Sequence, residues 1–335
     1  MPRVLRHQTK TLAQTQNWIL RTFVGSFNET VLITGASGFL GSNLSGRLVH
    51  KGAEVHAVSR VQRIPESGCM RWWQGDMADV ETTRALLGKI NPGVIIHLAG
   101  LSTASPEREL VLPTLHSLLV STVNLLVVAA EMHCRRIILA GSLTEPLPNR
   151  PESIPDSPYA AAKWASGGYV RMFHQLYDVP VVTVRPFMTY GPRQDKRKLI
   201  PHVILSLLKG EIPKLSSGQQ EFDWIYVDDV VEGFLLATEA PGIEGRTIDL
   251  GSGALVSVRT VVENLTDLVG STERPQFGAL PDRPFEQART ADIGEAYAAM
   301  AWKPKTSLTE GLDRTVEWYS KRVVNVMGRS FQVRD

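Results

Sequence analysis

The run VLITGASGFLG at Val31–Gly41 constrains the fold more than any other stretch of this chain. A short apolar, β-branched segment leads through glycines into an amphipathic helical pattern, as a buried strand does when it turns directly into a helix. Gly35 permits the tight turn, Gly38 leaves room for a pyrophosphate, and Gly41 lets the helix pack closely. The N–H groups at the start of such a helix bind phosphate. The residues predicted to contact a dinucleotide here are Gly35, Ser37, Gly38, Phe39, Leu40 and Gly41.

Strand and helix signals alternate from Glu29 onward, which predicts a parallel sheet with helices on both faces. The predicted class is therefore α/β, a Rossmann-like doubly wound parallel sheet with a smaller C-terminal substrate-binding lobe, and ligands are expected at the carboxyl ends of the strands. Strands are expected at Val31–Thr34, Glu54–Val58, Val94–Leu98, Arg136–Ala140 and Val181–Arg185. Helices are expected at Asn43–His50, Glu81–Lys89, Leu115–Glu131 and Tyr159–Tyr177.

The remainder of the chain predicts a second, discontinuous lobe. Strand signals at Trp224–Val227 and Thr247–Leu250 are expected to return to the main sheet between its two pieces. Trp224 and Trp302 could stack on a nucleobase, but burial in the core is the favoured fate of both. The expected units are a basic extension at 1–28, a nucleotide-binding domain at 29–191 plus 221–256, and a substrate lobe at 192–220 plus 257–330.

Composition limits the partners only broadly. The 335 residues carry a formal net charge of +2, so neither nucleic-acid nor membrane binding is expected. No stretch is expected to approach the roughly 18 to 20 apolar residues of a membrane span, and the N-terminus lacks the apolar core of a secretory signal. Cys69 and Cys134 lack metal-ligand spacing and are expected to be buried small hydrophobes. We therefore expect a cytoplasmic protein in a reducing compartment, without a metal site.

The N-terminal extension is a basic leader, because Arg3, Arg6, Lys10 and Arg21 are accompanied there by no acidic residue. Such a leader is typical of a transit peptide, of an arm that docks on a partner, or of a loosely ordered extension. The last interpretation is favoured.

The end of the second predicted strand bears on the choice of cofactor. An NAD-selective site has an acidic residue there, whereas a 2′-phosphate is better met by serine and arginine. This chain has Ser59 and Arg60, with Arg63 close behind. NADP is therefore the preferred cofactor, and NAD is the alternative if Arg60 is only a solvated loop residue. Asp76 and Met77 follow in a loop whose carboxylate either contacts adenine or caps a turn.

Tyr159 and Lys163 form the strongest catalytic signal. Four residues apart on a helix, the phenol and the ammonium share one face, and the lysine charge is expected to lower the pKa of the tyrosine towards neutrality. Such a pair can exchange a proton with an alcohol or a ketone. Pro155 and Pro158 indicate that a helix begins here. Ser142, after the fourth strand, is expected to place its hydroxyl beside Tyr159.

Several ordered motifs run through the chain. They are TGASGFLG at Thr34–Gly41, HLAG at His97–Gly100, YAAAK at Tyr159–Lys163, RPFMTYGP at Arg185–Pro192, DWIYVDD at Asp223–Asp229 and the closing WKPKTSLTEGLDRTVEWY at Trp302–Tyr319. Together they resemble the extended short-chain dehydrogenase/reductases, specifically the NAD(P)-dependent epimerase/dehydratase group that acts on nucleotide-diphospho-sugars. The resemblance implies hydride transfer between a nicotinamide and a sugar carbon, usually C4. It also implies that Tyr159 is the acid/base, that Lys163 binds the nicotinamide ribose, and that Ser142 orients the sugar oxygen.

The resemblance implies further contacts as well. Cofactor contacts are expected at Leu98, Ala99, Gly100 and Arg185. Contacts to a nucleotide-diphospho-sugar are expected at Ser102, Ser142, Thr144, Met188, Arg193 and Arg283. Of these, Arg193 and Arg283 are the expected diphosphate partners. Because the two long helices commonly form a four-helix contact in this group, a homodimer is expected.

Some positions depart from the pattern of the group. Family dehydratases that remove water across C5 and C6 have an Asp-Glu pair where this chain has Leu143 and Thr144, so a 4,6-dehydratase is not expected. Glu145, one residue further on, is a minor candidate acid. Met188 and Phe222 stand where an Asn and an Arg often contact the substrate.

A supporting Asn of the group is also replaced. Leu118 stands at that position, and Ser117 is the candidate to compensate.

Two enzyme functions remain open. An NADPH-dependent reductase of a nucleotide-linked 4-ketohexose would consume its cofactor and agrees with Ser59 and Arg60. A nucleotide-sugar 4-epimerase, similar to UDP-glucose 4-epimerase, oxidises and re-reduces the same carbon with a retained cofactor, usually NAD. The reductase is the preferred hypothesis. A remote alternative is a non-catalytic nucleotide-binding sensor, whose expected mark is the loss of Tyr159 or Lys163.

Overall fold

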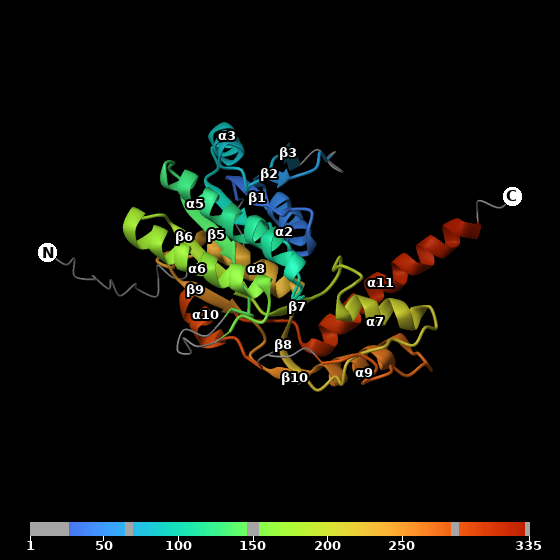
Figure 1. The fold of residues 1–335 in the computed structure, drawn as a ribbon. Coiled ribbons are helices and arrows are strands. Elements are labelled where there is room, and N and C mark those ends of the chain that lie inside the picture. The colour runs from blue at the N-terminus through green and yellow to red at the C-terminus, as the bar shows by residue number, and fades with distance from the viewer. Residues whose placement is uncertain (1–26, 64–69, 146–153, 283–287, 332–335) are drawn as a thin grey trace.

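A computed structural model describes residues 27–63, 70–145, 154–282 and 288–331 (Figure 1). Seven parallel strands form the main sheet in the order β3-β2-β1-β4-β5-β6-β9. Strand order reverses between β1 and β4, so ligands of such a sheet bind at the carboxyl ends of these two strands. The predicted doubly wound α/β class is confirmed. The strands are β1 (Thr30–Thr34), β2 (Glu54–Ser59), β3 (Met70–Gln74), β4 (Val94–His97), β5 (Arg136–Ala140), β6 (Val181–Pro186) and β9 (Thr247–Leu250).

Helices cover both faces of the main sheet, which explains why its central strands are apolar on both sides (Figure 1). Helices α2 and α8 pack on one face, where Leu44 and Phe234 belong to the larger apolar core. Helices α3, α5 and α6 pack on the other, where Leu87, Leu125 and Phe173 belong to a second core. Their bounds are α2 (Phe39–His50), α3 (Val80–Ile90), α5 (Ser121–Ala130), α6 (Pro158–Tyr177) and α8 (Val227–Glu239).

The edge strand β3 escaped the sequence analysis. It pairs in parallel with β2, but its burial alternates only weakly, because one side of an edge strand faces solvent. Arg71 and Gln74 are exposed, while Trp72 and Trp73 are half-buried. The five predicted strands and four predicted helices are otherwise present, with ends shifted by a few residues.

The C-terminal lobe has its own three-stranded sheet, in the order β10-β8-β7. The prediction that Trp224–Val227 returns to the main sheet is wrong, because Trp224 lies in β8 and pairs with Met188 of β7. The prediction for Thr247–Leu250 is confirmed, since β9 pairs with β6. Trp224 and Trp302 are both buried in the core, as favoured. The remaining elements are β7 (Met188–Tyr190), α7 (Leu199–Leu208), β8 (Glu221–Tyr226), β10 (Leu255–Ser257), α9 (Val258–Val269), α10 (Ile293–Met300) and α11 (Leu308–Phe331).

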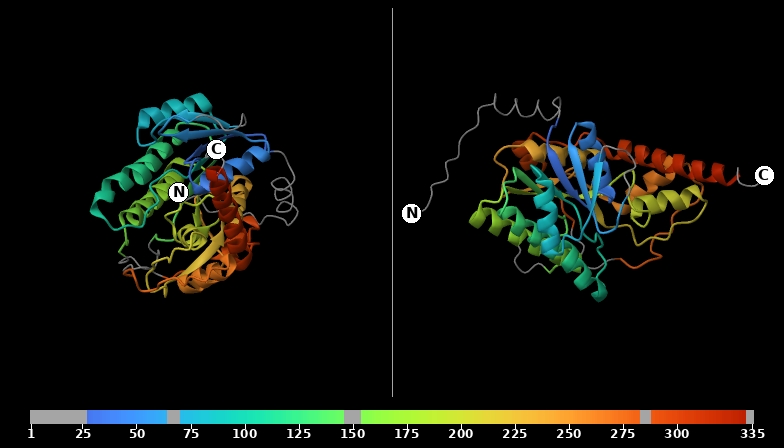
Figure 2. Two further views of the ribbon diagram at one scale, coloured as in Figure 1. Left: turned by 90° about the vertical axis from the view of Figure 1, so that its right-hand side faces the viewer. Right: turned by 90° about the horizontal axis from the view of Figure 1, so that it is seen from above.

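Helix α11 begins inside the lobe and runs outward, so that its far end projects beyond the rest of the molecule (Figure 2). Its first turns are anchored, because Leu312 and Val316 are buried in the larger core.

One continuous helical run, Arg108–Ala130, precedes β5. It comprises η1 (Arg108–Leu110), α4 (Val111–Thr114), the π-helical η2 (Leu115–Val120) and α5. By length and composition this run could cross a membrane, so the expectation that no stretch approaches a membrane span is wrong. Leu118, Leu125 and Leu126 are buried on the sheet and its neighbouring helices, which accounts for part of the apolar character.

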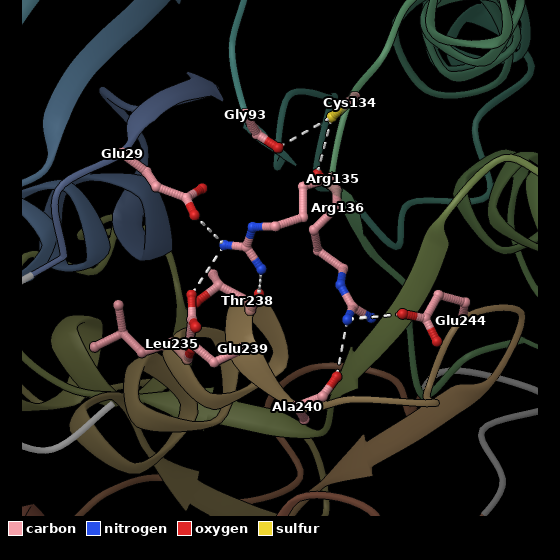
Figure 3. A network of polar contacts seen from close by, with 10 residues as sticks. All are labelled: Glu29, Gly93, Cys134, Arg135, Arg136, Leu235, Thr238, Glu239, Ala240 and Glu244. Carbon is pink, nitrogen blue, oxygen red and sulfur yellow. Dashed lines mark hydrogen bonds and ion pairs between the residues drawn. The ribbon is translucent and has the colours of Figure 1, made fainter. Parts of the chain in front are cut away.

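Ion pairs lie at the amino ends of the strands, on the edge of the sheet opposite the predicted site (Figure 3). Arg135 lies 2.8 Å from Glu29 and 2.9 Å from Glu239, and Arg136 lies 2.9 Å from Glu244. Cys134 is half-buried there, and burial raises the pKa of its thiol to about 11. Cys69, the N-terminal extension up to residue 26 and Arg283 lie outside the described residues.

Candidate active site

The glycine turn after β1 closes against the end of β4. Gly35 has φ = +71°, and a Cβ there would lie 2.7 Å from the backbone nitrogen of Ala99, so only glycine fits. A Cβ at Gly41 would overlap the carbonyl oxygen of Gly35 and lie 2.7 Å from Ala36 Cα. Gly38 caps α2 without a side-chain hydrogen bond to the first N–H groups of the helix. This backbone cradle fits the pyrophosphate of a dinucleotide.

The other predicted residues of the turn differ in exposure. Ser37 is exposed, whereas Phe39 and Leu40 are half-buried against the core. Asn43 Nδ2 donates a 3.3 Å hydrogen bond to the carbonyl oxygen of Pro192, which brings the RPFMTYGP segment beside α2. Arg193 follows Pro192 and has a left-handed backbone conformation, with φ = +71°. The backbone of this predicted diphosphate partner therefore lies beside α2, the helix that follows the glycine turn.

His97 ties the end of β4 to its neighbours. Its Nδ1 lies 2.8 Å from Thr34 Oγ1, and its Nε2 lies 3.3 Å from Ser121 Oγ. Thr34 Oγ1 also accepts a 3.1 Å hydrogen bond from the N–H of Ala99. Burial, aided by the charge of Lys163, lowers the pKa of His97 to about 3, so the ring is neutral. His97 belongs to the HLAG motif, but the motif alone did not indicate this supporting role.

The predicted cofactor residues Leu98–Gly100 follow directly. Gly100 has φ = +150°, and a Cβ there would overlap the side chain of Leu118. Ser117 Oγ accepts a 3.2 Å hydrogen bond from the N–H of Leu101. Leu118 therefore packs against this loop, and Ser117 supplies the polar contact to it.

The end of β2 holds the residues on which cofactor preference was predicted. Ser59 Oγ lies 3.4 Å from Arg63 Nε, and the Arg63 guanidinium lies 5.5 Å from the ring centre of Trp72. Arg60 is exposed. Asp76 accepts a 3.0 Å hydrogen bond from the N–H of Ala78 and so caps a turn, the second of its two predicted roles.

Met77, beside it, is buried in the turn that precedes α3. Its carbonyl oxygen accepts a 3.1 Å hydrogen bond from Asn124 Nδ2, which ties this loop to α5.

The three predicted catalytic residues come together at the carboxyl end of β5. Ser157 caps α6 by accepting a 3.2 Å hydrogen bond from the N–H of Ala160, which fixes the start of the helix that carries Tyr159 and Lys163. The hydroxyls of Ser142 and Ser102 each lower the pKa of Tyr159. These residues can therefore hold and move a proton at one substrate oxygen.

The pKa values of the pair differ from the sequence prediction. Lys163 and Tyr159 keep some exposed surface, but their polar ends lie deep among protein atoms. Burial raises the pKa of Tyr159, and the Ser142 hydroxyl lowers it less. Burial also lowers the pKa of Lys163 to about 8. The expectation that Lys163 brings Tyr159 towards neutrality is therefore wrong in this state, because desolvation outweighs the other effects.

Of the predicted substrate residues, those that the structure describes lie near Ser142 or in and beside the RPFMTYGP segment. The hydroxyls of Ser142 and Thr144 are 2.9 Å apart. The carbonyl oxygen of Ser102 accepts a 3.3 Å hydrogen bond from Lys198 Nζ. Met188 is half-buried and packs against the larger core.

Arg185, predicted as a cofactor contact, takes part in a charge cluster. Its Nε donates a 2.6 Å hydrogen bond to Asp249 Oδ1, and Arg289 Nη2 lies 3.6 Å from Asp249 Oδ2. Sequence analysis missed Asp249 and Arg289, because they come from β9 and from the segment before α10, far from Arg185 in the chain. Strand pairing between β6 and β9 brings Asp249 beside Arg185, and the segment before α10 adds Arg289.

Asp223, the first residue of the DWIYVDD motif, has a structural role. Its carboxylate accepts hydrogen bonds from the N–H groups of Ser252 at 2.5 Å, Gly253 at 3.0 Å and Ala291 at 2.9 Å. Since Asp223 is only 1% exposed, it joins three segments of the lobe rather than contacting a ligand.

Comparison with solved structures supports this architecture. A crystal structure of UDP-glucose 4-epimerase from Thermotoga maritima, with UDP-glucose, superposes with a TM-score of 0.81 at 24% identity, over 88% of this chain and 99% of that one. MoeE5 in complex with UDP-glucose and NAD superposes with a TM-score of 0.79 at 28% identity, over 88% and 99% of the two chains.

Comparison of sequences identifies the family. The NAD dependent epimerase/dehydratase family matches residues 31–251. UDP-glucose 4-epimerase of Mycolicibacterium smegmatis is 31% identical over 314 residues, covering 87% of this chain and 98% of that protein. dTDP-glucose 4,6-dehydratase of Salmonella typhimurium is 28% identical over 352 residues, covering 90% and 96%. The chain is therefore an enzyme of the NAD-dependent epimerase/dehydratase family, the extended short-chain dehydrogenase/reductase group that its motifs predicted.

Proposed function

We propose that this enzyme is a nucleotide-sugar 4-epimerase that inverts the configuration at C4 of a nucleotide-diphospho-sugar. The observation that carries the proposal is the convergence of Ser142, Tyr159 and Lys163 at the end of β5. The similarity to a UDP-glucose 4-epimerase over nearly the whole chain supports epimerisation over the reductase preferred from sequence.

The residues divide the work. A bound nicotinamide would supply the chemistry of hydride uptake and return. Tyr159 takes the proton of the C4 hydroxyl and gives it back, and Ser142 holds the C4 oxygen by a hydrogen bond. Lys163 would donate a hydrogen bond to the nicotinamide ribose. The glycine turn and Leu98–Gly100 would hold the dinucleotide.

Dehydration across C5 and C6 is disfavoured, although several relatives are 4,6-dehydratases. That reaction needs an acid and a base beside the sugar. Leu143 and Thr144 offer neither, and the carboxylate of Glu145 is engaged by the backbone N–H of Ser142 at 2.6 Å.

A 4-ketohexose reductase is the second candidate, because the end of β2 favours NADP. Ser59 and the exposed Arg60 can meet a 2′-phosphate, and Arg63 lies beside Ser59. The NAD in the MoeE5 complex supports NAD for the epimerase instead.

Cofactor stoichiometry separates the two candidates. The protein is incubated with UDP-glucose and with a panel of nucleotide-linked 4-ketohexoses, with NAD or NADPH, and the products are resolved. An epimerase converts the hexose to its C4 epimer with catalytic cofactor, whereas a reductase oxidises one NADPH per 4-ketosugar. Absence of both conversions contradicts action at C4.

Substrate recognition is assigned to Ser102, Thr144, Met188, Arg193 and Arg283, with the lobe built from 192–220 and 257–330. Arg193 and Arg283 neutralise the diphosphate in this proposal. Replacing Arg193 by Ala should raise KM for the nucleotide sugar and leave KM for the cofactor unchanged.

A second copy of the chain covers an apolar patch on α4, η2 and α6. Val111 and Leu112 of α4 are exposed by 44% and 65%, and Trp164 of α6 is exposed by 44%. Leu115 of η2 and Ala161 of α6 line a hollow between these helices. Such a patch is typical of an interface. We propose that this dimer is cytoplasmic, because the cysteine content favours a reducing compartment. A monomeric mass in sedimentation would count against it.

A further inference from the structure

The carboxylate of Glu145 lies against the backbone that carries Ser142. Oε1 accepts a 2.6 Å hydrogen bond from the N–H of Ser142, and the N–H of Glu145 donates a 3.2 Å hydrogen bond to the carbonyl oxygen of Ser142. A Cβ at Gly141 would lie 2.9 Å from Oε1, and a Cβ at Gly167 of α6 would lie 3.8 Å from Oε2. Two positions without side chains therefore make room for this carboxylate.

Holding Ser142 also holds its hydroxyl. Ser142 Oγ lies 2.9 Å from Thr144 Oγ1 and accepts a 3.3 Å hydrogen bond from the N–H of Thr144. The same hydroxyl interacts with Tyr159. Because Ser142 is only 6% exposed, its backbone position decides where the hydroxyl points.

The charge of Glu145 faces cations from three elements, namely Lys163 of α6, Arg185 of β6 and Arg289 before α10. Asp249 of β9 already pairs with both arginines, and Arg289 Nη1 lies 3.4 Å from the Glu145 carbonyl oxygen. Among the residues that the structure describes, Glu145 is therefore the acidic group whose charge acts on Lys163.

His97 of β4 also faces Lys163, but its ring is neutral and does not balance the charge of the lysine. Burial raises the pKa of Glu145, while the Ser142 N–H and the surrounding cations lower it.

We propose that Glu145 is a positioning residue for proton exchange at Tyr159: it fixes the backbone of Ser142 and sets the electrostatic environment of Tyr159 and Lys163. The inference rests on the proposed function in assigning that exchange to Tyr159. It replaces the expectation that Glu145 is an acid, because its carboxylate binds the backbone behind Ser142.

Glu145→Gln tests the charge, since the amide keeps an oxygen for the N–H of Ser142. A negative charge disfavours the loss of a proton from both Tyr159 and Lys163. Both limbs of the pH profile of kcat should therefore move to lower pH, by roughly one pH unit. Glu295→Gln is the matched control, because Glu295 is exposed and pairs with Arg246 away from the site; it should leave both limbs in place.

A second measurement needs no substrate. The ultraviolet absorbance of tyrosinate is titrated over the pH range in which circular dichroism shows a folded protein, and the titration of the Tyr159→Phe variant is subtracted. In the Glu145→Gln background the Tyr159 signal should appear at lower pH than in the wild type. This readout decides the inference even if no activity at C4 is found, so the two proposals can fail separately.

Glu145→Ala removes the acceptor as well as the charge. Its kcat should fall roughly tenfold further than that of Glu145→Gln, while the Kd for the cofactor stays that of the wild type. Wild-type kcat in Glu145→Ala, or an unmoved Tyr159 titration in Glu145→Gln, would overturn the inference. If Glu145→Ala does not fold, the titration of Glu145→Gln decides alone.

Discussion

Lys163 Nζ donates a 2.6 Å hydrogen bond to the carbonyl oxygen of Ala140, the last residue of β5. This bond joins the helix that carries Tyr159 to the strand end from which Ser142 follows. The three proposed catalytic residues therefore lie on a strand end and on the helix that is bonded to it, although two of them are separated from the third by a long connection in the chain. Rigid support of this kind is what proton exchange at one oxygen requires.

Tyr159→Phe should abolish turnover while preserving cofactor binding. The ring remains, but the group that exchanges the proton is lost, so kcat should fall by about 10² to 10⁴. Steady-state kinetics and fluorescence titration with the cofactor measure the two effects. Turnover close to that of the wild type would contradict the assignment of Tyr159.

Lys163→Met should make the protein more stable and inactive. The pKa of Lys163 is lowered to about 8, so burying its charge destabilises the folded state below pH 8, and this cost is relieved as pH rises towards the ordinary value. At pH 7 the variant should gain ~1–3 kcal/mol in the free energy of unfolding. Urea unfolding at pH 7 and pH 9 checks this, and the gain should shrink at the higher pH.

His97 should make the fold acid-sensitive. Burial lowers the pKa of His97 to about 3. The unfolded chain therefore binds a proton at His97 below about pH 6.5, whereas the folded chain does not bind it until the pH approaches 3. Stability from this group is therefore complete above pH 6.5 and is lost as pH falls, by up to ~1.4 kcal/mol per pH unit. In His97→Gln the free energy of unfolding should fall less steeply between pH 6.5 and pH 5, because the uptake of about one proton on unfolding is lost. A slope equal to that of the wild type would contradict the neutral ring.

Gly41→Ala and Gly46→Ala form a matched pair within α2. A Cβ at Gly41 would collide with the backbone of Gly35 and Ala36, so the turn must shift and cofactor binding should fall at least tenfold. A Cβ at Gly46 would meet nothing within 4 Å, and the alanine should stabilise the helix by ~0.5–1 kcal/mol. Cofactor titration and thermal unfolding of both variants test this contrast.

Ser59→Asp tests the cofactor preference. A carboxylate at the end of β2 accepts hydrogen bonds from the adenine ribose and repels a 2′-phosphate. The ratio of the Kd for NADP to the Kd for NAD, measured by fluorescence titration, should rise roughly tenfold or more. If the wild type already strongly prefers NAD, Ser59 and Arg60 do not select NADP.

The sequence alone determined the fold class and the glycine turn. Apolar runs such as Val31–Thr34 and Val94–His97 are buried on both faces, and amphipathic helices follow them, so periodicity indicates a parallel sheet without any knowledge of contacts. The glycine positions are equally local, because the steric demand at Gly35 and Gly41 arises within the turn and its neighbouring strand. The edge strand β3 was lost, because one exposed side blurs the pattern.

Only the tertiary structure decided how distant segments meet. Trp224–Val227 has the pattern of a strand, but its partner strand was set by the lobe, and it pairs with β7. Arg185 and Asp249 meet because β6 pairs with β9, and Arg289 joins their charge cluster from the segment before α10. The pKa values of Tyr159 and Lys163 follow the depth of their polar ends, which spacing along a helix does not reveal. Glu145 likewise changes from a candidate acid to a support of Ser142, because folding alone decides where a carboxylate points.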